Sequence, residues 1–123
     1  MKYNLIIATL FVFFLGSCEE KKEESNQEET TVIQNGVTIS TLKVCGNCEM
    51  CKKTIEKSLQ VDGIKKADWN IDTKIMTVQY NPSVITLDQI EKDMANVGYD
   101  NMKYKGNDSA YKELPECCQY ERK

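Results

Sequence analysis

The sequence predicts an α+β domain whose elements follow the order β-α-β-β-α-β. Short runs of β-branched or alternating apolar residues predict the strands. Two stretches with apolar residues every three or four positions predict amphipathic helices. Gly, Asn, Asp and Pro separate these runs, as expected of turns between short elements.

The first half of this pattern contains one strand and one helix. Residues 37–44 (VTISTLKV) are short and rich in β-branched side chains, which predicts the first strand. Residues 49–60 (EMCKKTIEKSLQ) place Cys51, Ile55 and Leu59 on one helical face, with Lys and Glu on the other. The helix is expected to stop at Gly63, which can take a left-handed cap.

The second half contains a hairpin and another helix. Residues 64–71 alternate toward their end and residues 75–80 (IMTVQY) alternate throughout, which predicts two strands joined by a turn. Thr86 and Gln89 stand at the spacing of a helix capping box, and Gly98 marks the end of that helix.

Residues 99–105 are then predicted to form a last strand. Two helices on one face of the resulting four-stranded antiparallel sheet form the ferredoxin-like arrangement. The residues predicted to fill its core are Leu42, Val44, Ile55, Leu59, Ile64, Trp69, Ile71, Met76, Val78, Leu87, Ile90, Met94 and Val97.

An apolar run from Leu5 to Leu15 near the start is short for a membrane span and ends in small residues before Cys18. This stretch resembles the signal peptide of bacterial lipoproteins. The resemblance implies cleavage before Cys18, lipidation of that cysteine, and attachment to a membrane that faces the periplasm or the cell surface. An ordinary signal peptide cut nearby, or an uncleaved anchor, remains an alternative.

Four segments follow from these observations: a signal peptide (1–17), an acidic tether (18–36), a domain (37–105) and a tail (106–123). The tether contains six Glu, two Lys and no apolar residue between positions 19 and 31, so it is expected to be disordered. Residues 37–123 carry 13 basic and 13 acidic side chains, a balance that argues against nucleic acid as a partner. The chain has no histidine, and it therefore lacks the commonest general base and zinc's usual nitrogen ligand.

The cysteines are the candidate functional residues of this sequence. Cys45, Cys48 and Cys51 are each separated by two residues, and Cys117 and Cys118 are neighbours in the tail. Cys48 in a loop and Cys51 in the first helical turn can point at one spot, where the helix N-terminus favours thiolate. Thiolates select soft ions: Cu(I), Zn(II), Cd(II) or Hg(II). Two sulfurs suit Cu(I) or Hg(II), whereas four suit tetrahedral Zn(II).

The sequence around these residues resembles the heavy-metal-associated (HMA) domain. The matching features are Cys48 and Cys51 after a first strand, the stretch DGIKKADWNIDTKIMTVQYNP, and VGYD at the end of the second helix. Copper metallochaperones, modules of copper-transporting ATPases and periplasmic mercury-binding proteins share this domain, and the resemblance covers residues 37–105. It implies a carrier of Cu(I) rather than an enzyme, with a metal-transporting ATPase or an efflux component as its partner.

Two positions near the predicted site bear on how closely the chain follows that family. The family motif is M-x-C-x-x-C, and Gly46 occupies the position of its methionine. A glycine there predicts a looser loop. Tyr99 matches a tyrosine that bacterial members of the family hold near the metal.

The remaining cysteines raise a separate question. Besides Cys18 there are five, an odd number that cannot all pair within one chain, and neighbouring cysteines pair only with strain. We predict that the tail folds back and brings Cys117, Cys118 or both to the Cys48/Cys51 site. The alternative is a separate surface feature.

Three further points stay open at this stage. Cys45 is either a further ligand or a small apolar residue of the core. Met50 could add a weak thioether donor. The sequence also leaves open whether two chains share a metal ion across a dimer.

Three functional classes compete, of which the third is a module that uses a metal ion only to stabilise its own fold. The first is a lipid-anchored carrier of a soft metal ion in the cell envelope. The second is a thiol–disulfide oxidoreductase that uses Cys48 and Cys51, since Cys-x-x-Cys motifs outside the cytosol often have that role. Against the second class, the only prolines are Pro82 and Pro115, in turn-like places, and the tail cysteines would have no use.

Overall fold

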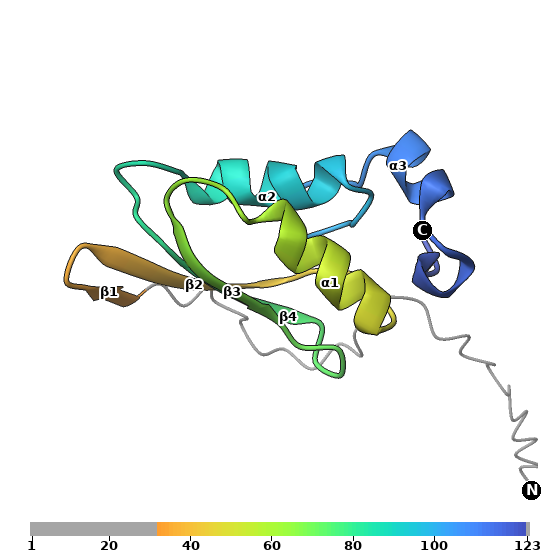
Figure 1. Ribbon diagram of the computed structural model, residues 1–123, viewed down its shortest axis with the longest axis horizontal. Coiled ribbons are helices and arrows are strands. Elements are labelled where there is room, and N and C mark those ends of the chain that lie inside the picture. The colour runs from red at the N-terminus through yellow and green to blue at the C-terminus, as the bar shows by residue number, and fades with distance from the viewer. Residues whose placement is uncertain (1–31, 123) are drawn as a thin grey trace, which may run out of the picture.

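The computed structural model describes residues 32–122 and confirms the ferredoxin-like α+β fold. A four-stranded antiparallel sheet carries two helices on one face, and the tail packs at one end of them (Figure 1). The elements are β1 (Val32–Gln34), β2 (Val37–Lys43), α1 (Glu49–Ser58), β3 (Ile64–Trp69), β4 (Ile75–Tyr80), α2 (Leu87–Asn96), α3 (Asp108–Glu113) and a 3-10 turn, η1 (Glu116–Cys118).

The sheet has the strand order β1-β2-β4-β3. Buried and partly exposed residues alternate along β2 and β4, so one face of the sheet is dry and the other borders water. Leu42 of β2 lies opposite Met76 of β4 on the dry face, and α1 and α2 cover it (Figure 1).

The source of the fourth strand differs from the prediction. Residues 99–105 do not form a strand; a single bridge joins Asn101 to Val44. The side-chain oxygen of Asn101 accepts hydrogen bonds from the backbone N–H groups of Lys103 and Tyr104, and its own N–H donates to the Tyr104 carbonyl. These bonds close a tight turn, so the segment cannot extend along the sheet.

The fourth strand is instead β1, from residues 32–34, which the sequence prediction assigned to the tether. It pairs with β2 through a two-residue turn at Asn35 and Gly36, whose φ angles are 51° and 76°. Asn-Gly is the commonest sequence for a hairpin turn in which both central residues have positive φ.

The predicted core is largely confirmed. Nine of its members are buried: Leu42, Val44, Ile55, Leu59, Trp69, Met76, Val78, Ile90 and Met94. Four are only partly buried at its margin: Ile64, Ile71, Leu87 and Val97. The structure adds buried residues that the predicted core did not include: Cys51, Tyr80, Ile85, Ala95, Tyr99, Cys118 and Tyr120.

Local signals set the ends of the helices. The Thr86 hydroxyl accepts a hydrogen bond from the Gln89 N–H at 3.2 Å and caps α2, as predicted. The Gln89 side chain binds Asp93 at 2.8 Å, so the reciprocal half of a capping box is missing. Gly98 follows α2 with φ of 98°. Gly63 also has a positive φ, 92°, but it does not end α1 as predicted: the helix already ends at Ser58, and Gly63 lies in the turn before β3.

Helix α3 and η1 bring the tail back against the loop that follows α2. The backbones of Gly98 and Gly106 touch there, and a Cβ on Gly106 would lie 2.5 Å from the Gly98 carbonyl carbon. The Tyr120 hydroxyl accepts from the Asp100 N–H and donates to the Gly98 carbonyl, both at 2.7 Å. The tail is therefore held to this loop by buried hydrogen bonds and close packing.

A charged contact reinforces the same junction. The Arg122 guanidinium binds the Asp100 carboxylate at 2.6 Å and Asp108 at 2.8 Å, and lies 4.4 Å from the centre of the Tyr111 ring. Partial burial alone would raise the pKa of Asp100, but Arg122 and the Gly106 N–H hold it below its ordinary value. The contact is thus fully present at neutral pH and is lost only when acid protonates Asp100.

Within residues 32–122, no helix is both long and apolar enough to cross a membrane.

Replacing Tyr120 with Phe is expected to lower the free energy of unfolding by about 1–3 kcal/mol, because the Asp100 N–H and the Gly98 carbonyl lose their partner in a buried position. Urea denaturation of the reduced, metal-free protein measures this change. Tyr104→Phe is the matched control: that hydroxyl binds the Asp88 carboxylate at the surface, and its loss should cost much less. Equal effects of the two changes would contradict this view of the junction.

Candidate metal centre

The cysteine loop connects the end of β2 to the start of α1. The Cys45 N–H donates to the Asp100 carbonyl at 2.8 Å, so the loop is tied to the segment that also holds the tail. Cys48 is the N-cap of α1, in an extended conformation with φ of −145°, and Cys51 lies in the first turn. The Asn47 N–H points at the Cys51 sulfur, 3.3 Å away.

Four free thiols gather at this point, with Cys48 at their centre. The Cys48 Sγ lies 3.5 Å from the Sγ atoms of Cys51 and Cys117, and 3.6 Å from that of Cys118. The two tail sulfurs are 3.9 Å apart. The structure thus brings both tail cysteines to Cys48, as the prediction of a folded-back tail requires.

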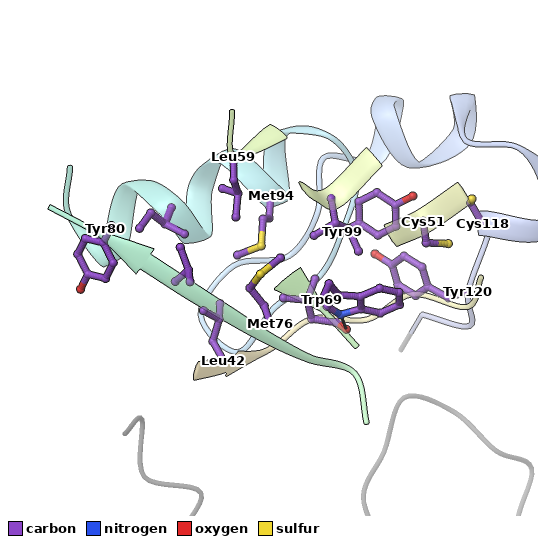
Figure 2. Close-up of a cluster of buried hydrophobic side chains, with 14 of the residues drawn as sticks. Leu42, Cys51, Leu59, Trp69, Met76, Tyr80, Met94, Tyr99, Cys118 and Tyr120 are labelled. Atoms are coloured by element: carbon purple, nitrogen blue, oxygen red, sulfur yellow. Dashed lines mark hydrogen bonds between the residues drawn. The ribbon is translucent and has the colours of Figure 1, made fainter. Parts of the chain in front are cut away.

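The four thiols differ in their access to water. Cys51 and Cys118 are fully buried, Cys48 is half-buried, and Cys117 is exposed. Figure 2 shows Cys51 and Cys118 side by side at the edge of the core, next to the rings of Tyr99 and Tyr120. The cluster therefore has a dry inner side and an outer side that another molecule can reach.

The surroundings favour thiolate at Cys48. Partial burial works against the charge, but the Cys51 N–H and the thiols of Cys117, Cys51 and Cys118 lower the pKa of Cys48 to about 7. Burial raises the pKa of Cys118, and its neighbours Cys51 and Cys48 raise it further. The pKa of Cys117 is also raised, chiefly by Cys48. Of these three cysteines, Cys48 is thus the one that most readily carries a negative charge.

Tyr99 closes the inner side of the cluster. Its side chain is fully buried, and its hydroxyl makes no hydrogen bond of ordinary geometry within the described residues. Burial raises the pKa of Tyr99, and the thiols of Cys51 and Cys118 are the polar groups beside it. This places Tyr99 next to the sulfurs, while its position near a bound metal stays a prediction.

Gly46 is packed rather than loose, contrary to the prediction from its place in the motif. A Cβ there would lie 2.8 Å from the Trp69 ring and 3.3 Å from the Cys51 Cβ. The indole is fully buried, and its N–H donates to the Val44 carbonyl at 3.1 Å. Trp69 thus leaves no room for a side chain at position 46, which explains why a glycine stands there.

Lys52 follows the cysteines but is directed toward the sheet. Its ammonium binds Glu56 at 2.5 Å, Asp68 at 2.6 Å and the Trp69 carbonyl at 2.7 Å. These bonds fix α1 on the end of β3, and the N-terminus of α1, where Cys48 is the N-cap, presents the positive end of the helix dipole to the thiols.

Three other predicted residues have different outcomes. Met50 is half-exposed and its Sδ lies 3.7 Å from the Cys117 Sγ, close enough to serve as a further donor. Cys45 is not among the four free thiols, and it borders a separate hollow with Asn101 and Tyr104. The predicted lipidation of Cys18 lies outside the described residues.

The residues that hold the tail were not predicted from the sequence. They are Asp100, Gly106, Tyr111, Tyr120 and Arg122. The Tyr120 ring stacks on Tyr99 at 6.0 Å between centres and meets Tyr111 edge-on at 5.2 Å. The signal in the sequence that could have indicated a packed tail was the pair of tyrosines, Tyr111 and Tyr120, in a segment without a clear apolar periodicity.

Replacing Gly46 with Ala is expected to destabilise the fold by about 1–3 kcal/mol, because the new methyl overlaps a buried indole that cannot move away. Thermal or urea unfolding measures the loss. In a double-mutant cycle with Trp69→Phe, which removes the overlapping ring atoms, the penalty of Gly46→Ala should shrink. A penalty that is unchanged by Trp69→Phe would contradict the steric explanation.

Iodoacetamide is expected to alkylate Cys48 first when the reduced, metal-free chain is labelled at pH 7.5, because Cys48 is largely thiolate there while Cys117 is more exposed but protonated. Peptide mapping by mass spectrometry identifies the labelled site. The rate should rise as the pH passes through about 7. Faster labelling of Cys117 would show that exposure, and not charge, controls reactivity.

Known proteins are similar to this chain in sequence and in fold. The family model described as "Heavy-metal-associated domain" matches residues 45–100. The copper chaperone CopZ of Staphylococcus epidermidis is 32% identical over 66 residues, which cover 52% of this chain and 97% of the chaperone. A copper-exporting P-type ATPase of Staphylococcus saprophyticus is 37% identical over 70 residues, but these cover only 9% of that ATPase.

A solved structure gives the same result. A CopZ metallochaperone superposes with a TM-score of 0.51 at 32% identity, covering 52% of this chain and 98% of the other. The region of similarity therefore spans nearly the whole of a small metal carrier. The chain belongs to the heavy-metal-associated domain family.

Proposed function

We propose that this protein binds Cu(I) through Cys48 and Cys51, with the tail cysteines as additional ligands, and passes the ion to another thiolate site in the cell envelope. The observation that carries the proposal is the cluster of three thiols within 3.6 Å of the Cys48 sulfur. Family membership and the copper chaperones among the relatives support a role in metal binding and transfer.

The donor set favours a soft ion. The cluster contains sulfur atoms only, the chain has no histidine, and the ammonium of Lys52, the residue that follows Cys51, is bound to carboxylates. Thiolate sulfur selects Cu(I), Zn(II), Cd(II) and Hg(II) over hard cations. Cu(I) is the proposed ion because it accepts two or three sulfurs, the number that this site brings together around Cys48.

Transfer proceeds by ligand exchange, with no bond made or broken except those to the metal. An incoming thiolate of the partner reaches the ion beside the exposed Cys117. Each new metal–sulfur bond to the partner then replaces one metal–sulfur bond to this chain. The proposed partner is a thiolate site on a metal-transporting ATPase or efflux component, in keeping with the ATPases among the relatives. No chemical transformation of a substrate is required.

Location follows from the predicted lipid on Cys18, which would hold the domain beside a membrane that faces the periplasm or the cell surface. Exposed dithiols oxidise in such a compartment unless they are reduced or hold a metal. The burial of Cys51 and Cys118 supports this proposal because it removes two of the four sulfurs from contact with oxidants.

One observation favours a thiol–disulfide oxidoreductase as a second candidate. Cys48 has a pKa of about 7, and its sulfur lies 3.5 Å from Cys51, which suits an attacking thiolate beside a resolving thiol. Insulin reduction with an excess of reductant tests this candidate directly. Catalysed turnover that survives Cys117→Ser/Cys118→Ser would favour it over the metal carrier.

Replacing Cys48 with Ser is expected to weaken Cu(I) binding by more than about 100-fold, since even outer-shell partners of metal ligands contribute about 10–100-fold. The double change Cys117→Ser/Cys118→Ser should weaken it by about 10–100-fold while leaving the fold intact. Competition against a coloured Cu(I) chelator measures both affinities.

Glu116→Gln is the control for the tail, because Glu116 lies in the same 3-10 turn, is exposed and offers no sulfur. It should retain the affinity of the unchanged chain. Unaltered affinity in the double Ser variant would contradict the proposed role of the tail cysteines, and unaltered affinity in Cys48→Ser would contradict the proposed function itself.

A further inference from the structure

The sulfur atoms of the cluster form two overlapping sets that share Cys48. In the first set, the sulfurs of Cys48 and Cys51 are 3.5 Å apart. In the second, the sulfurs of Cys48, Cys117 and Cys118 all lie within 4.8 Å of one another, and Cys51 is not a member of that group. The four thiols therefore do not surround a single point.

Bond lengths limit what one ion can hold. A metal–sulfur bond is about 2.3 Å long, so two sulfurs on one ion lie at most about 4.6 Å apart. The sulfur contacts at Cys48, from 3.5 to 3.6 Å, meet this condition in both sets. Because Cys51 stands outside the second set, one tetrahedral divalent ion on all four sulfurs would require the tail to move.

Met50 adds a further sulfur donor to the second set, on the side of the cluster that faces water. Its Sδ lies 3.7 Å from the Cys117 Sγ, on the exposed side of the cluster, and 49% of the Met50 side chain is accessible to water. A thioether is a neutral, soft donor that suits Cu(I) and is a poor ligand for hard ions. An exposed methionine beside an exposed cysteine gives the outer side a donor pair of its own.

We propose that the cluster takes a second soft monovalent ion, held by Cys117, Cys118 and Met50, with the Cys48 thiolate bridging to the first ion at Cys51. This inference rests on the proposed function and concerns the number of ions at the same site. With all four cysteines deprotonated, two Cu(I) ions leave a net charge of −2 on the sulfurs and metals, and the protons displaced from the remaining thiols go to the solvent. A single Cu(I) on the same four thiolates would leave −3, a larger charge to hold beside a buried core.

The second position gives the outer donors a separate role from the inner ones. Cys51 and Cys118 are buried against the core beside Tyr99, Cys48 is half-buried between the two sets, and Cys117 and Met50 of the outer position face water. The outer ion is therefore the one that an incoming thiolate meets first, and the inner ion is the one that the core protects.

Titration of the reduced full-length chain with Cu(I) under anaerobic conditions, followed by native mass spectrometry, tests the proposal. The unchanged chain is expected to bind two ions as a monomer, and Cys117→Ser is expected to bind one. Met50→Leu should retain the first ion and bind the second about tenfold more weakly. Met102→Leu is the matched control: Met102 is 66% exposed and outside the sulfur cluster, so this variant should match the unchanged chain.

Four results would overturn the inference: saturation of the unchanged chain at one Cu(I), two ions retained by Cys117→Ser, the same second affinity for Met50→Leu and Met102→Leu, or two ions found only between two chains. Failure of the proposed function looks different, because the unchanged chain would then bind no Cu(I) at all. Circular dichroism of each variant checks that the fold is kept, which is expected because both altered side chains lie on the exposed side of the cluster.

Discussion

The Tyr120 hydroxyl connects the tail to the rest of the domain, and the composition of the thiol cluster depends on this connection. By accepting from the Asp100 N–H and donating to the Gly98 carbonyl, it satisfies two backbone groups that are closed off from water. The same ring stacks on Tyr99, which touches the inner thiols. Two residues before it, Cys118 is thereby placed in the core beside Cys48.

In this arrangement, sulfur atoms that lie a few ångströms apart differ in their exposure to water, from fully buried to exposed. Cys51 and Cys118 have the dry surroundings that stabilise a bound ion, while Cys117 and Met50 remain open to a partner. Cys48 is common to both sides, and its thiolate character comes from the helix N-terminus and from the neighbouring thiols. A site with this gradation can hold an ion firmly and still offer an exchangeable ligand to an incoming thiolate.

Much of the fold was predictable because periodicity and capping residues are local signals. The helices around Ile55 and Ile90, the hairpin of β3 and β4, and most of the core follow from spacing alone. Two features depended on other information. The Asn101 side chain turns the last segment away from the sheet, and the Asn35–Gly36 pair creates a strand in a segment whose preceding residues are highly charged.

The candidate site was predictable in its residues but not in its arrangement. The spacing of Cys48 and Cys51 and the odd number of cysteines pointed to the tail, yet the contacts that dock it join residues far apart in sequence, as Arg122 and Asp100 do. The packing of Gly46 against Trp69 was also hidden, because the ring reaches the loop from another strand. Long-range contacts of this kind leave no periodic signal in a single sequence.

The tail rests on the cysteine loop through contacts made by the protein chain itself. Nuclear Overhauser contacts in the reduced, metal-free chain measure this most directly. Contacts are expected between the side chains of Cys118 and Cys48, and between the rings of Tyr120 and Tyr99. Random-coil shifts across residues 107–122, with neither contact observed, would contradict it.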